Sequence, residues 1–471
     1  MAIVGYFAEF YVSDEAGASD FNGGGPRFSA NGGPVDSTIF ASVAAGGLEI
    51  SHGIGWTDVQ VDDWIVWDVG NVLANGQEWR RVTSIAGLPA SFTVHAAVNG
   101  AAAGGPGITI YVGGHWATAN HAAGNTVGTD CEVDATSLNS SGYPPRVNVK
   151  GYAPGVYDHS GILFNGSGSS GRIATYEGYE TEAGDRCPNG IRPVLLDNAN
   201  MLLELGIPEY YSIVLFDCYM AGDWDMVGCT NPNTSEFNTF TDCRFTKSGA
   251  STNKNWVTPD INSSFFMGCE FISTTPNIFY MEASQSNFFG CLVEGGLGSI
   301  PVIGGPGVID LRDGSSFLFS IAVNRDGHNT TEIYVGDYSI VLNCIVYCDS
   351  VLGIHTDQED SIVENTIVYC DQQFEFYFQV DGVPCRNCRA YDVGIVPFRW
   401  DRGYINCVVE DSRLYDITNN RYQLGPNSPC IDAVDPDTFL FMSDIASSVM
   451  KLDIGPLQLR RRTKAVSPVT N

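Results

Sequence analysis

A short pattern of hydrophobic and polar residues recurs along the middle of the chain. Each copy has an apolar or aromatic residue, a small polar residue or glycine, a Cys and two residues of strand character, as in Leu342-Asn343-Cys344-Ile345-Val346. Ser or Thr replaces Cys in two copies. The key positions are Cys218, Cys243, Cys269, Cys291, Ser320, Cys344, Thr366, Cys388 and Cys407. Differences between successive positions run from 19 (388 to 407) to 29 (291 to 320), which is typical of a solenoid.

The residues between these positions indicate the kind of solenoid. Helical solenoids need amphipathic helices, and the chain shows no long stretch with a 3.6-residue apolar period and good caps. Leucine-rich repeats would show Leu at several fixed offsets, which is not seen. A coil of three short strands joined by turns remains. We therefore predict an all-β, right-handed parallel β-helix whose coils stack at a spacing of ~4.8 Å.

The key positions fit the inner wall of such a coil. Small side chains would stack there above and below their equivalents as a structural ladder. The Asn, Asp or Gly before them suits a corner with left-handed backbone. The asparagines that fit an asparagine ladder are Asn343, Asn365, Asn387 and Asn406.

The 14 cysteines would suggest disulfides in a small secreted domain, but this chain has 471 residues. Stacked side chains in parallel strands point the same way, so we expect mostly free thiols. Cys348, Cys370 and Cys385 fall outside the ladder, and a pair among them is left open. Cys385 and Cys388 have CxxC spacing, but we favour a structural role over a metal or redox role. We predict no metal site.

The repeat and its flanking segments predict three regions. Residues 1–112 form an N-terminal β domain that could serve as an anchor, with strand-like alternation over 58–67 and a second strand over 78–83. Residues 113–430 form the parallel β-helix. Residues 431–471 form a C-terminal cap with a short helix near 440–450 and a basic tail, because an uncovered solenoid end invites end-to-end association.

The charge and hydrophobicity of the chain limit the classes of molecule that it can bind. The formal net charge is −30, from 54 acidic and 24 basic residues, which excludes nucleic acid and anionic membranes as general partners. No apolar run approaches the ~20 residues needed to span a bilayer, so we expect no membrane insertion. We expect no cofactor, although such an acidic surface could attract Ca²⁺.

The first residues, Met1 to Phe10, show no secretory signal pattern. We therefore expect the protein on a virion surface, or outside the cell by a route that needs no N-terminal signal.

Two phrases resemble bacterial and phage right-handed β-helix proteins of the pectate-lyase-like superfold, including phage tailspikes. One is Asn427-Ser428-Pro429-Cys430-Ile431-Asp432-Ala433, followed by Leu452-Asp453-Ile454-Gly455. The other is Tyr11-Val12-Ser13 with its Gly-, Asp- and Asn-rich continuation. Val434 stands where the family usually has Gly. The resemblance implies a fold and an extracellular or virion setting, but no single activity, since lyases, hydrolases, adhesins and virion proteins share this scaffold.

Our first functional hypothesis is a structural or adhesive phage virion component, such as a tail spike, fibre or capsid-decorating protein. Its partners would be other virion proteins or copies of itself, with a trimer as the expected homo-oligomer, and cell-surface polysaccharide. Trp224 and Tyr377 are the candidate glycan-binding residues, because aromatic rings stack on sugars, although aromatic residues in a β-helix more often form core stacks.

The alternative is a polysaccharide lyase or glycoside hydrolase on the same scaffold. Glycosidases need two carboxylates and lyases need a proton acceptor. The candidate catalytic residues, all in predicted turns, are Asp223, Asp225, Asp326, His328, His355 and Asp357. Such clusters also arise by chance when 54 acidic residues are spread over a solenoid.

Overall fold

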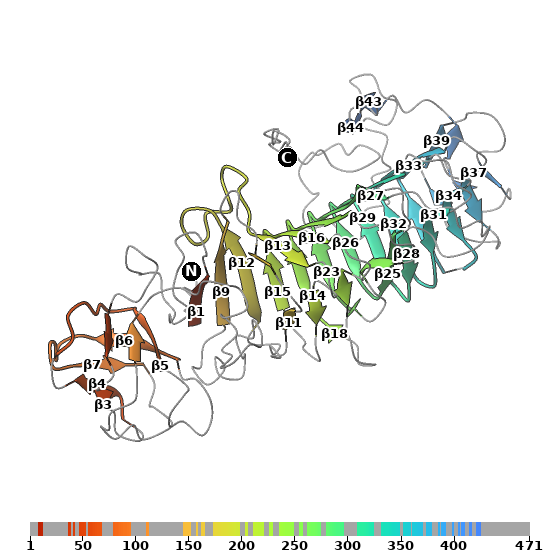
Figure 1. The fold of residues 1–471 in the computed structure, drawn as a ribbon. Helices are drawn as coiled ribbons and strands as arrows, with labels where there is room; N and C mark the ends of the chain where they lie inside the picture. Colours follow the sequence, from red (N-terminus) through yellow and green to blue (C-terminus); the bar gives the residue numbers. More distant parts are fainter. Residues whose placement is uncertain are drawn as a thin grey trace, which may run out of the picture. The chain divides into compact units, whose positions relative to one another are not determined.

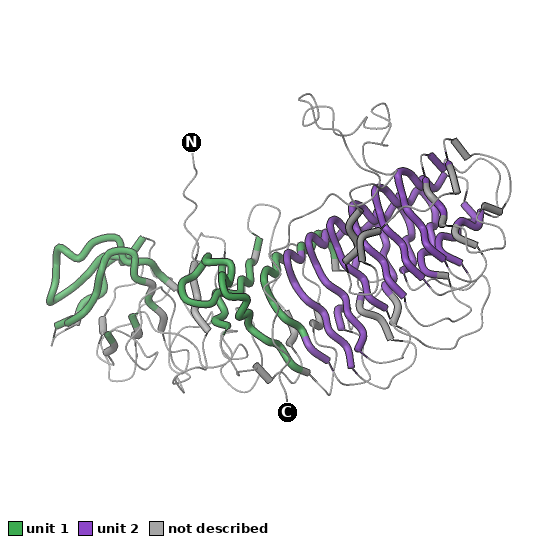
Figure 2. The backbone as a smooth tube through the Cα atoms, turned by 90° about the horizontal axis from the view of Figure 1, so that it is seen from above, with its two compact units in different colours: residues 1–218, 229–239 green, residues 219–228, 240–471 purple. Residues whose placement is uncertain are grey.

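The structure is a computed structural model of the 471-residue chain, which forms two compact units. Unit 1 is 1–218 with 229–239, and unit 2 is 219–228 with 240–471 (Figure 2). The described residues are 8–12, 36–38, 41–42, 47–52, 55–67, 79–95, 110–112, 145–151, 157–158, 162–164, 173–197, 203–205, 211–220, 226–228, 235–248, 254–257, 261–274, 279–295, 309–324, 331–348, 352–358, 360–370, 374–378, 385–386, 388–391, 398–399, 404–405, 407–409, 414–416 and 421–424.

Unit 2 is built from three parallel sheets whose strands follow one another in a fixed rotation along the chain (Figure 1). The first sheet contains β23 (Phe265–Met267), β26 (Asn287–Phe289), β29 (Ser316–Leu318), β32 (Ile340–Leu342), β35 (Ile362–Glu364), β38 (Cys385–Arg386) and β41 (Tyr404–Ile405). The second contains β20 (Arg244–Lys247), β24 (Glu270–Ser273), β27 (Leu292–Gly295), β30 (Ile321–Asn324), β33 (Ile345–Cys348), β36 (Ile367–Cys370), β39 (Arg389–Tyr391) and β42 (Val408–Val409).

The third sheet of unit 2 contains β17 (Val227–Gly228), β21 (Lys254–Val257), β25 (Phe279–Ser284), β28 (Ile309–Arg312), β31 (Thr331–Val335), β34 (Leu352–Thr356), β37 (Phe374–Phe378) and β40 (Phe398–Arg399). Strand β22 (Ile261–Asn262) also pairs with β25, and β43 (Leu414–Asp416) forms an antiparallel hairpin with β44 (Arg421–Leu424). Strands β16 (Asp217–Met220) and β19 (Thr239–Thr241) contain residues of both units. Each coil thus contributes one strand to each sheet, which is a parallel β-helix.

The corner between the first and second sheets carries the Cys, Ser and Thr side chains of the recurring pattern. Within unit 2 these residues are buried except Cys407, which is half-buried. The residue before the key position has left-handed backbone in the six coils from Asp242 to Asn365, for example at Asn343 (φ 55°) and Asn365 (φ 49°). Asn387 and Asn406 lie outside the described residues. The Cys344 thiol donates to the Phe317 carbonyl oxygen at 3.1 Å. A Cβ added at Gly268 (φ 65°) would lie 2.4 Å from a side-chain oxygen of Asp242, so the Asp242 side chain would have to move.

A second ladder, which the sequence analysis missed, lies at the corner between the third and first sheets. It consists of buried serines, one in each coil: Ser264, Ser286, Ser315, Ser339 and Ser361. The Ser286 amide donates to the Ser315 hydroxyl at 3.1 Å, and that hydroxyl donates to the carbonyl oxygen of Ala283 at 3.0 Å. These bonds satisfy backbone groups that the corner would otherwise leave unpaired.

The interior of unit 2 is filled by rows of equivalent residues. In the first sheet the register places Phe266 beside Phe288, and the two rings stack with centroids 4.7 Å apart. Phe240 stacks on Phe266 at 4.6 Å. The row continues through Phe317, Val341 and Val363 to Cys385, so its side chains become smaller from Phe317 to Cys385.

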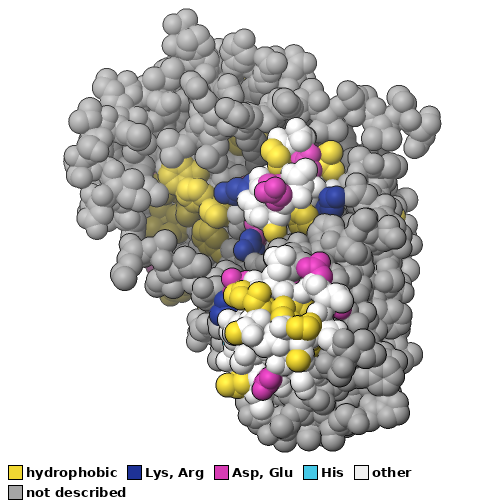
Figure 3. All heavy atoms as spheres, turned by 90° about the vertical axis from the view of Figure 1, so that its left-hand side faces the viewer, with side chains coloured by type: hydrophobic (Ala, Val, Ile, Leu, Met, Phe, Trp, Pro, Cys, Tyr) yellow, Lys and Arg dark blue, Asp and Glu magenta, His cyan; other side chains and the backbone are white. Residues whose placement is uncertain are grey.

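Unit 1 contains an antiparallel sheet in the order β2 (Asp36–Thr38), β8 (Ile110–Val112), β5 (Trp64–Trp67), β6 (Trp79–Ser84), β7 (Ser91–Val94), β4 (Glu49–His52), β3 (Ala41–Ser42). Its core consists of Ile50, Trp56, Val59, Ile65, Val82, Phe92, Val94 and Val112. Among the described residues on the face in Figure 3, both acidic and basic side chains lie beside groups of hydrophobic ones, so the charges there are of both signs.

Unit 1 also contains parallel strands. Strand β1 (Ala8–Val12) pairs with β9 (Pro145–Lys150), which pairs with β12 (Ala174–Tyr179), and β12 with β15 (Tyr211–Val214). The pairs β10 (Tyr157–Asp158) with β13 (Val194–Asp197) and β11 (Ile162–Phe164) with β14 (Leu203–Leu205) are parallel too. Strand β18 (Ser235–Glu236) completes the unit. Strand β1 thus lies with the parallel strands, although the sequence placed residues 1–112 in a separate domain.

The structure confirms the prediction of an all-β parallel β-helix with an additional N-terminal β sheet. The expected strand over 58–67 begins only at Trp64, and the strand expected at 78–83 is β6. The predicted cap at 431–471 and the family-like phrase at 427–433 lie outside the described residues. Among the described residues, no helix has the length and apolar character needed to cross a membrane.

Replacing Phe266 tests the stacked row. Phe266 is fully buried and its neighbour Phe265 is 37% exposed, because side chains alternate along a strand. We expect Phe266→Ala to lower the free energy of unfolding by roughly 3–5 kcal/mol and Phe265→Ala by less than about 1 kcal/mol, measured by urea unfolding. Equal losses in the two variants would contradict this assignment of faces.

Candidate functional site

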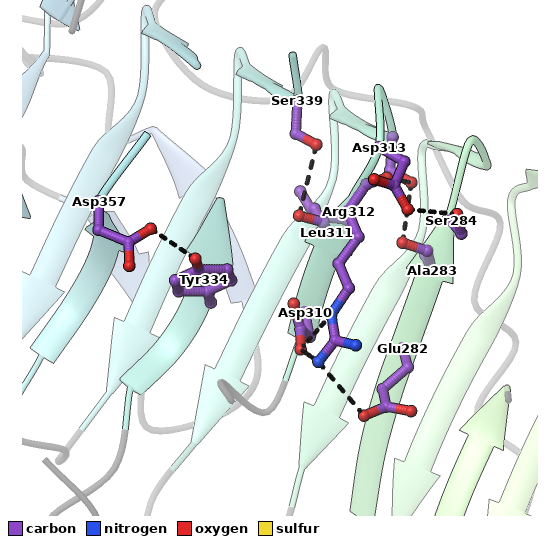
Figure 4. A network of polar contacts seen from close by, with 11 residues as sticks. Glu282, Ala283, Ser284, Asp310, Leu311, Arg312, Asp313, Tyr334, Ser339 and Asp357 are labelled. Carbon is purple, nitrogen blue, oxygen red and sulfur yellow. Dashed lines mark hydrogen bonds and ion pairs between the residues drawn. The ribbon is translucent and has the colours of Figure 1, made fainter. Parts of the chain in front are cut away.

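The outward face of the third sheet carries a row of polar and aromatic side chains, one from each of five consecutive coils. Alternation decides the face: Ile309 and Leu311 are fully buried core residues, so Asp310 between them points outward. The strand register then places in one row Glu282, Asp310, Tyr334, His355 and Tyr377. Figure 4 shows part of this row, which we call the outer row.

An arginine joins the two carboxylates at one end of the outer row. The guanidinium of Arg312 donates to Asp310 through Nε at 2.9 Å and through Nη2, and Nη2 lies 3.6 Å from Glu282 (Figure 4). Burial is the main cause that raises the pKa of Asp310, and the nearby Arg312 opposes the shift. The Arg312 side chain itself is 45% exposed, so part of it faces solvent and could reach an acidic ligand.

The middle of the outer row is aromatic. The Tyr334 hydroxyl donates to Asp357 at 2.6 Å, and the Tyr334 ring contacts the His355 ring at a centroid distance of 5.4 Å. His355 contacts Tyr377 at 5.1 Å on its other side. Burial first, and then the bond to Asp357, raises the pKa of Tyr334 to about 12. Tyr334 therefore stays a phenol that can donate a hydrogen bond at neutral pH.

His355 is held between these two rings and is only 1% exposed. Within the described part of the chain, neither ring nitrogen has a hydrogen-bond partner. Burial lowers the pKa of His355, and the nearby Asp357 only partly offsets this. At neutral pH the imidazole is therefore uncharged.

A further acid, Glu332, lies two residues before Tyr334 on β31 and is fully buried. Burial raises its pKa to about 8, although the nearby Asn324 side chain opposes the shift. Neither carboxylate oxygen meets hydrogen-bond geometry with a described residue. Glu332 is therefore mostly a neutral carboxylic acid at pH 7.

The structure places only some of the candidates predicted from the sequence. His355 and Asp357 lie together with Tyr377 around the outer row, at the end of one strand rather than in a separate turn. The other candidates, which lie outside the described residues, are Asp223, Trp224, Asp225, Asp326 and His328.

The sequence analysis missed Glu282, Asp310, Arg312, Glu332 and Tyr334. Each lies on the third strand of its coil, whereas the recurring pattern marks only the corner before the second strand. The signal that could have found them is the alternation in segments such as Ile309-Asp310-Leu311-Arg312, aligned from coil to coil.

No family model matches the chain, and no curated protein matches it. Among solved structures, similar chains include the A-module of a mannuronan C-5 epimerase from Azotobacter vinelandii (TM-score 0.30, 9% identity, covering 59% of this chain and 94% of that one). Another is a PL6 family polysaccharide lyase from Pseudopedobacter saltans (0.29, 11%, 59% and 91%). A third is a tailspike of the Acinetobacter baumannii bacteriophage AP22 (0.23, 10%, 81% and 65%).

Arg312→Met tests the charge pairing. It leaves the Asp310 carboxylate buried without its partner, so we expect a loss of roughly 1–3 kcal/mol in unfolding free energy at neutral pH. Removing the guanidinium raises the already raised pKa of Asp310 further. Protonation then favours the folded state, so the loss relative to the unchanged protein shrinks as pH falls from 7 toward 5. Urea unfolding at both pH values measures this.

Arg244→Met is the matched control. Arg244 pairs with Glu270 at 2.8 Å on the second sheet, and both side chains are partly exposed. There we expect a loss below about 1 kcal/mol. A loss in Arg312→Met that is equal at both pH values would contradict the role of Asp310.

Proposed function

We propose that this protein binds an extended polysaccharide along the outer row, as a glycan-binding surface component of a phage particle. The observation that carries the proposal is the outer row itself, in which polar and aromatic groups recur once per coil. Adjacent coils are ~4.8 Å apart. An extended chain of sugars lying along the solenoid would meet the partly exposed Glu282, Tyr334 and Tyr377 of this row, whereas Asp310 and His355 are buried.

The chemistry of the outer row suits sugars. Tyr334 and Tyr377 are partly exposed, and tyrosine rings stack on the apolar faces of sugar rings while their hydroxyls bond to sugar hydroxyls. Arg312 and Glu282 supply a donor and an acceptor at one end. The Arg312 guanidinium links Asp310 to Glu282, so we propose that the glycan binds there without Ca²⁺.

The particle setting rests on the sequence alone. The phrases at 11–13 and 427–433 resemble those of phage and bacterial β-helix proteins. A location on the virion surface, attachment to other virion proteins and assembly as a homotrimer belong to the same proposal. Stoichiometric multiples of the chain in purified virions would support it, and purified virions that lack the chain would contradict it.

A double substitution, Tyr334→Ala with Tyr377→Ala, tests glycan binding. We expect roughly tenfold weaker binding to host capsular polysaccharide, because two stacking contacts of about 0.5–1.5 kcal/mol each are removed. Calorimetry on the purified chain measures the affinity.

The control is Tyr347→Ala with Tyr369→Ala. This pair stacks at 4.8 Å on the outward face of the second sheet, and its removal should leave the affinity unchanged. If the control variant weakens binding as much as the outer-row variant does, the polysaccharide does not bind specifically at the outer row.

A polysaccharide lyase is the second candidate, because the strand of the partly exposed Arg312 pairs with the strand of Tyr334, and the Tyr334 phenol is bonded to the partly exposed Asp357. Lyases neutralise a uronate carboxylate, remove the neighbouring proton and protonate the leaving oxygen. Arg312 would bind the carboxylate, the Asp357 carboxylate would accept the neighbouring proton, and Tyr334 would protonate the leaving oxygen.

The variant Tyr334→Phe separates binding from cleavage. It keeps the ring and removes the hydroxyl, so a lyase should lose roughly 100-fold or more in the rate of forming unsaturated sugars, with polysaccharide affinity almost unchanged. The absence of any product from the unsubstituted protein would exclude the lyase for the polysaccharide tested. Equal rates in the two proteins would exclude Tyr334 as the proton donor.

A further inference from the structure

Three cysteines come together inside unit 2, away from the outer row. The Sγ atoms of Cys385, Cys388 and Cys407 all lie within 4.8 Å of one another, and those of Cys385 and Cys407 are 3.6 Å apart. None of the three is part of a disulfide. We propose that this cluster binds a thiophilic divalent cation of the Zn²⁺ class.

The register of the solenoid explains why the three sulfur atoms meet. Cys385 continues the inner row of the first sheet and pairs with Val363 on the preceding strand. Cys388 occupies the corner three residues later in the same coil. Arg386 pairs with Ile405, so Cys407 lies at the same corner in the next coil. The inner row of the first sheet and the corner ladder therefore both supply thiols to this cluster.

Other ladder cysteines lack this arrangement. Cys269 and Cys291 occupy the same corner in adjacent coils, but the inner row beside them carries Phe266 and Phe288. No sulfur atom from the first sheet therefore joins them. Among the described residues, Cys385, Cys388 and Cys407 form the one group of three or more His, Cys, Asp or Glu residues whose ligand atoms lie this close together.

The chemistry of the donors fits a soft or borderline cation. Thiolates are the preferred sulfur ligands of Zn²⁺, which accepts three protein ligands and one further small ligand. Burial raises the pKa values of Cys385 and Cys388, so without a cation both remain protonated thiols. A hydrogen bond from the Thr366 backbone lowers the pKa of Cys388 and so opposes part of the effect of burial. The same bond would help to hold a thiolate there.

Metal binding here releases protons. One Zn²⁺ bound by all three sulfur atoms as thiolates releases three protons to solvent, because a thiol that coordinates the metal loses its proton. The centre then carries one negative charge, and Cys407 is its partly exposed member. The protons leave as the metal–sulfur bonds form, and no oxidant is needed.

The sequence analysis favoured a purely structural role for the CxxC pair, because Cys388 already belongs to the ladder. The structure adds Cys407 as a third ligand and directs Cys385 into the interior. A Cys385–Cys407 disulfide is the competing chemistry, but 3.6 Å is well beyond the S–S bond length of about 2.05 Å.

The test uses the full chain, purified with a reductant and stripped of metal, then titrated with Cd²⁺ and with Co²⁺. We expect about one cation per chain, thiolate-to-metal charge-transfer absorption and a higher melting temperature. Mass spectrometry of the titrated protein gives the stoichiometry.

Cys385→Val keeps the core filled, because valine is the residue in this row one coil earlier, at Val363. We expect it to weaken Cd²⁺ binding by roughly 100-fold or more, since even residues behind the ligands matter by 10–100-fold. The control Cys348→Val makes the same change at a fully buried cysteine outside the cluster, and should bind as the unsubstituted protein does.

Three results would overturn the proposal: no binding above trace levels, binding by Cys385→Val equal to that of the control, or a Cys385–Cys407 disulfide in the reduced preparation. If the valine variant fails to fold, Cys407→Ser in an otherwise unchanged chain gives the same comparison. This site shares no residue with the outer row, so failure of metal binding would leave the glycan proposal untouched.

Discussion

The in-register pairing of each coil with the next is the constraint on which the rest of this structure depends. Parallel strands place every side chain directly beside its equivalent in neighbouring coils. The interior therefore consists of rows of like residues, such as Phe240, Phe266 and Phe288, whose rings stack 4.6 and 4.7 Å apart. A slip of one residue would turn each row from the core to solvent, so the fold and its register are determined together.

The corners pose the main polar problem, because a buried turn leaves backbone amides and carbonyls without partners. Two ladders of small side chains solve it. At one corner the Ser320 hydroxyl accepts from the Cys291 amide at 2.9 Å, and at the other the Ser286 hydroxyl accepts from the Ser264 amide at 3.2 Å. Each corner needs a residue with left-handed backbone, which Asn343 and Gly268 supply among others. The cysteines suit these corners because their side chains are small.

The same register builds both candidate sites. On the outside it aligns acids, aromatic residues and a histidine along the third sheet, and on the inside it lets thiols of two rows meet at Cys385, Cys388 and Cys407. A solenoid repeats its wall from coil to coil, so a site arises wherever a few rows depart from their usual residue. In the inner row of the first sheet, Cys385 follows Phe and Val residues of the earlier coils. In the outer row of the third sheet, the equivalent positions are occupied by residues such as Asp310 and His355.

The sequence by itself determined the parallel β-helix, because the corner pattern repeats at an almost constant offset from the first and second strands. The serine ladder was equally accessible, since Ser264, Ser286 and Ser339 each lie five residues before a key Cys. The outer row could not be found from the sequence in this way. Glu282 lies 13 residues after Cys269, Asp310 19 after Cys291 and His355 11 after Cys344. The connections before the third strand differ in length, so only backbone pairing in three dimensions decides which of these side chains share a face.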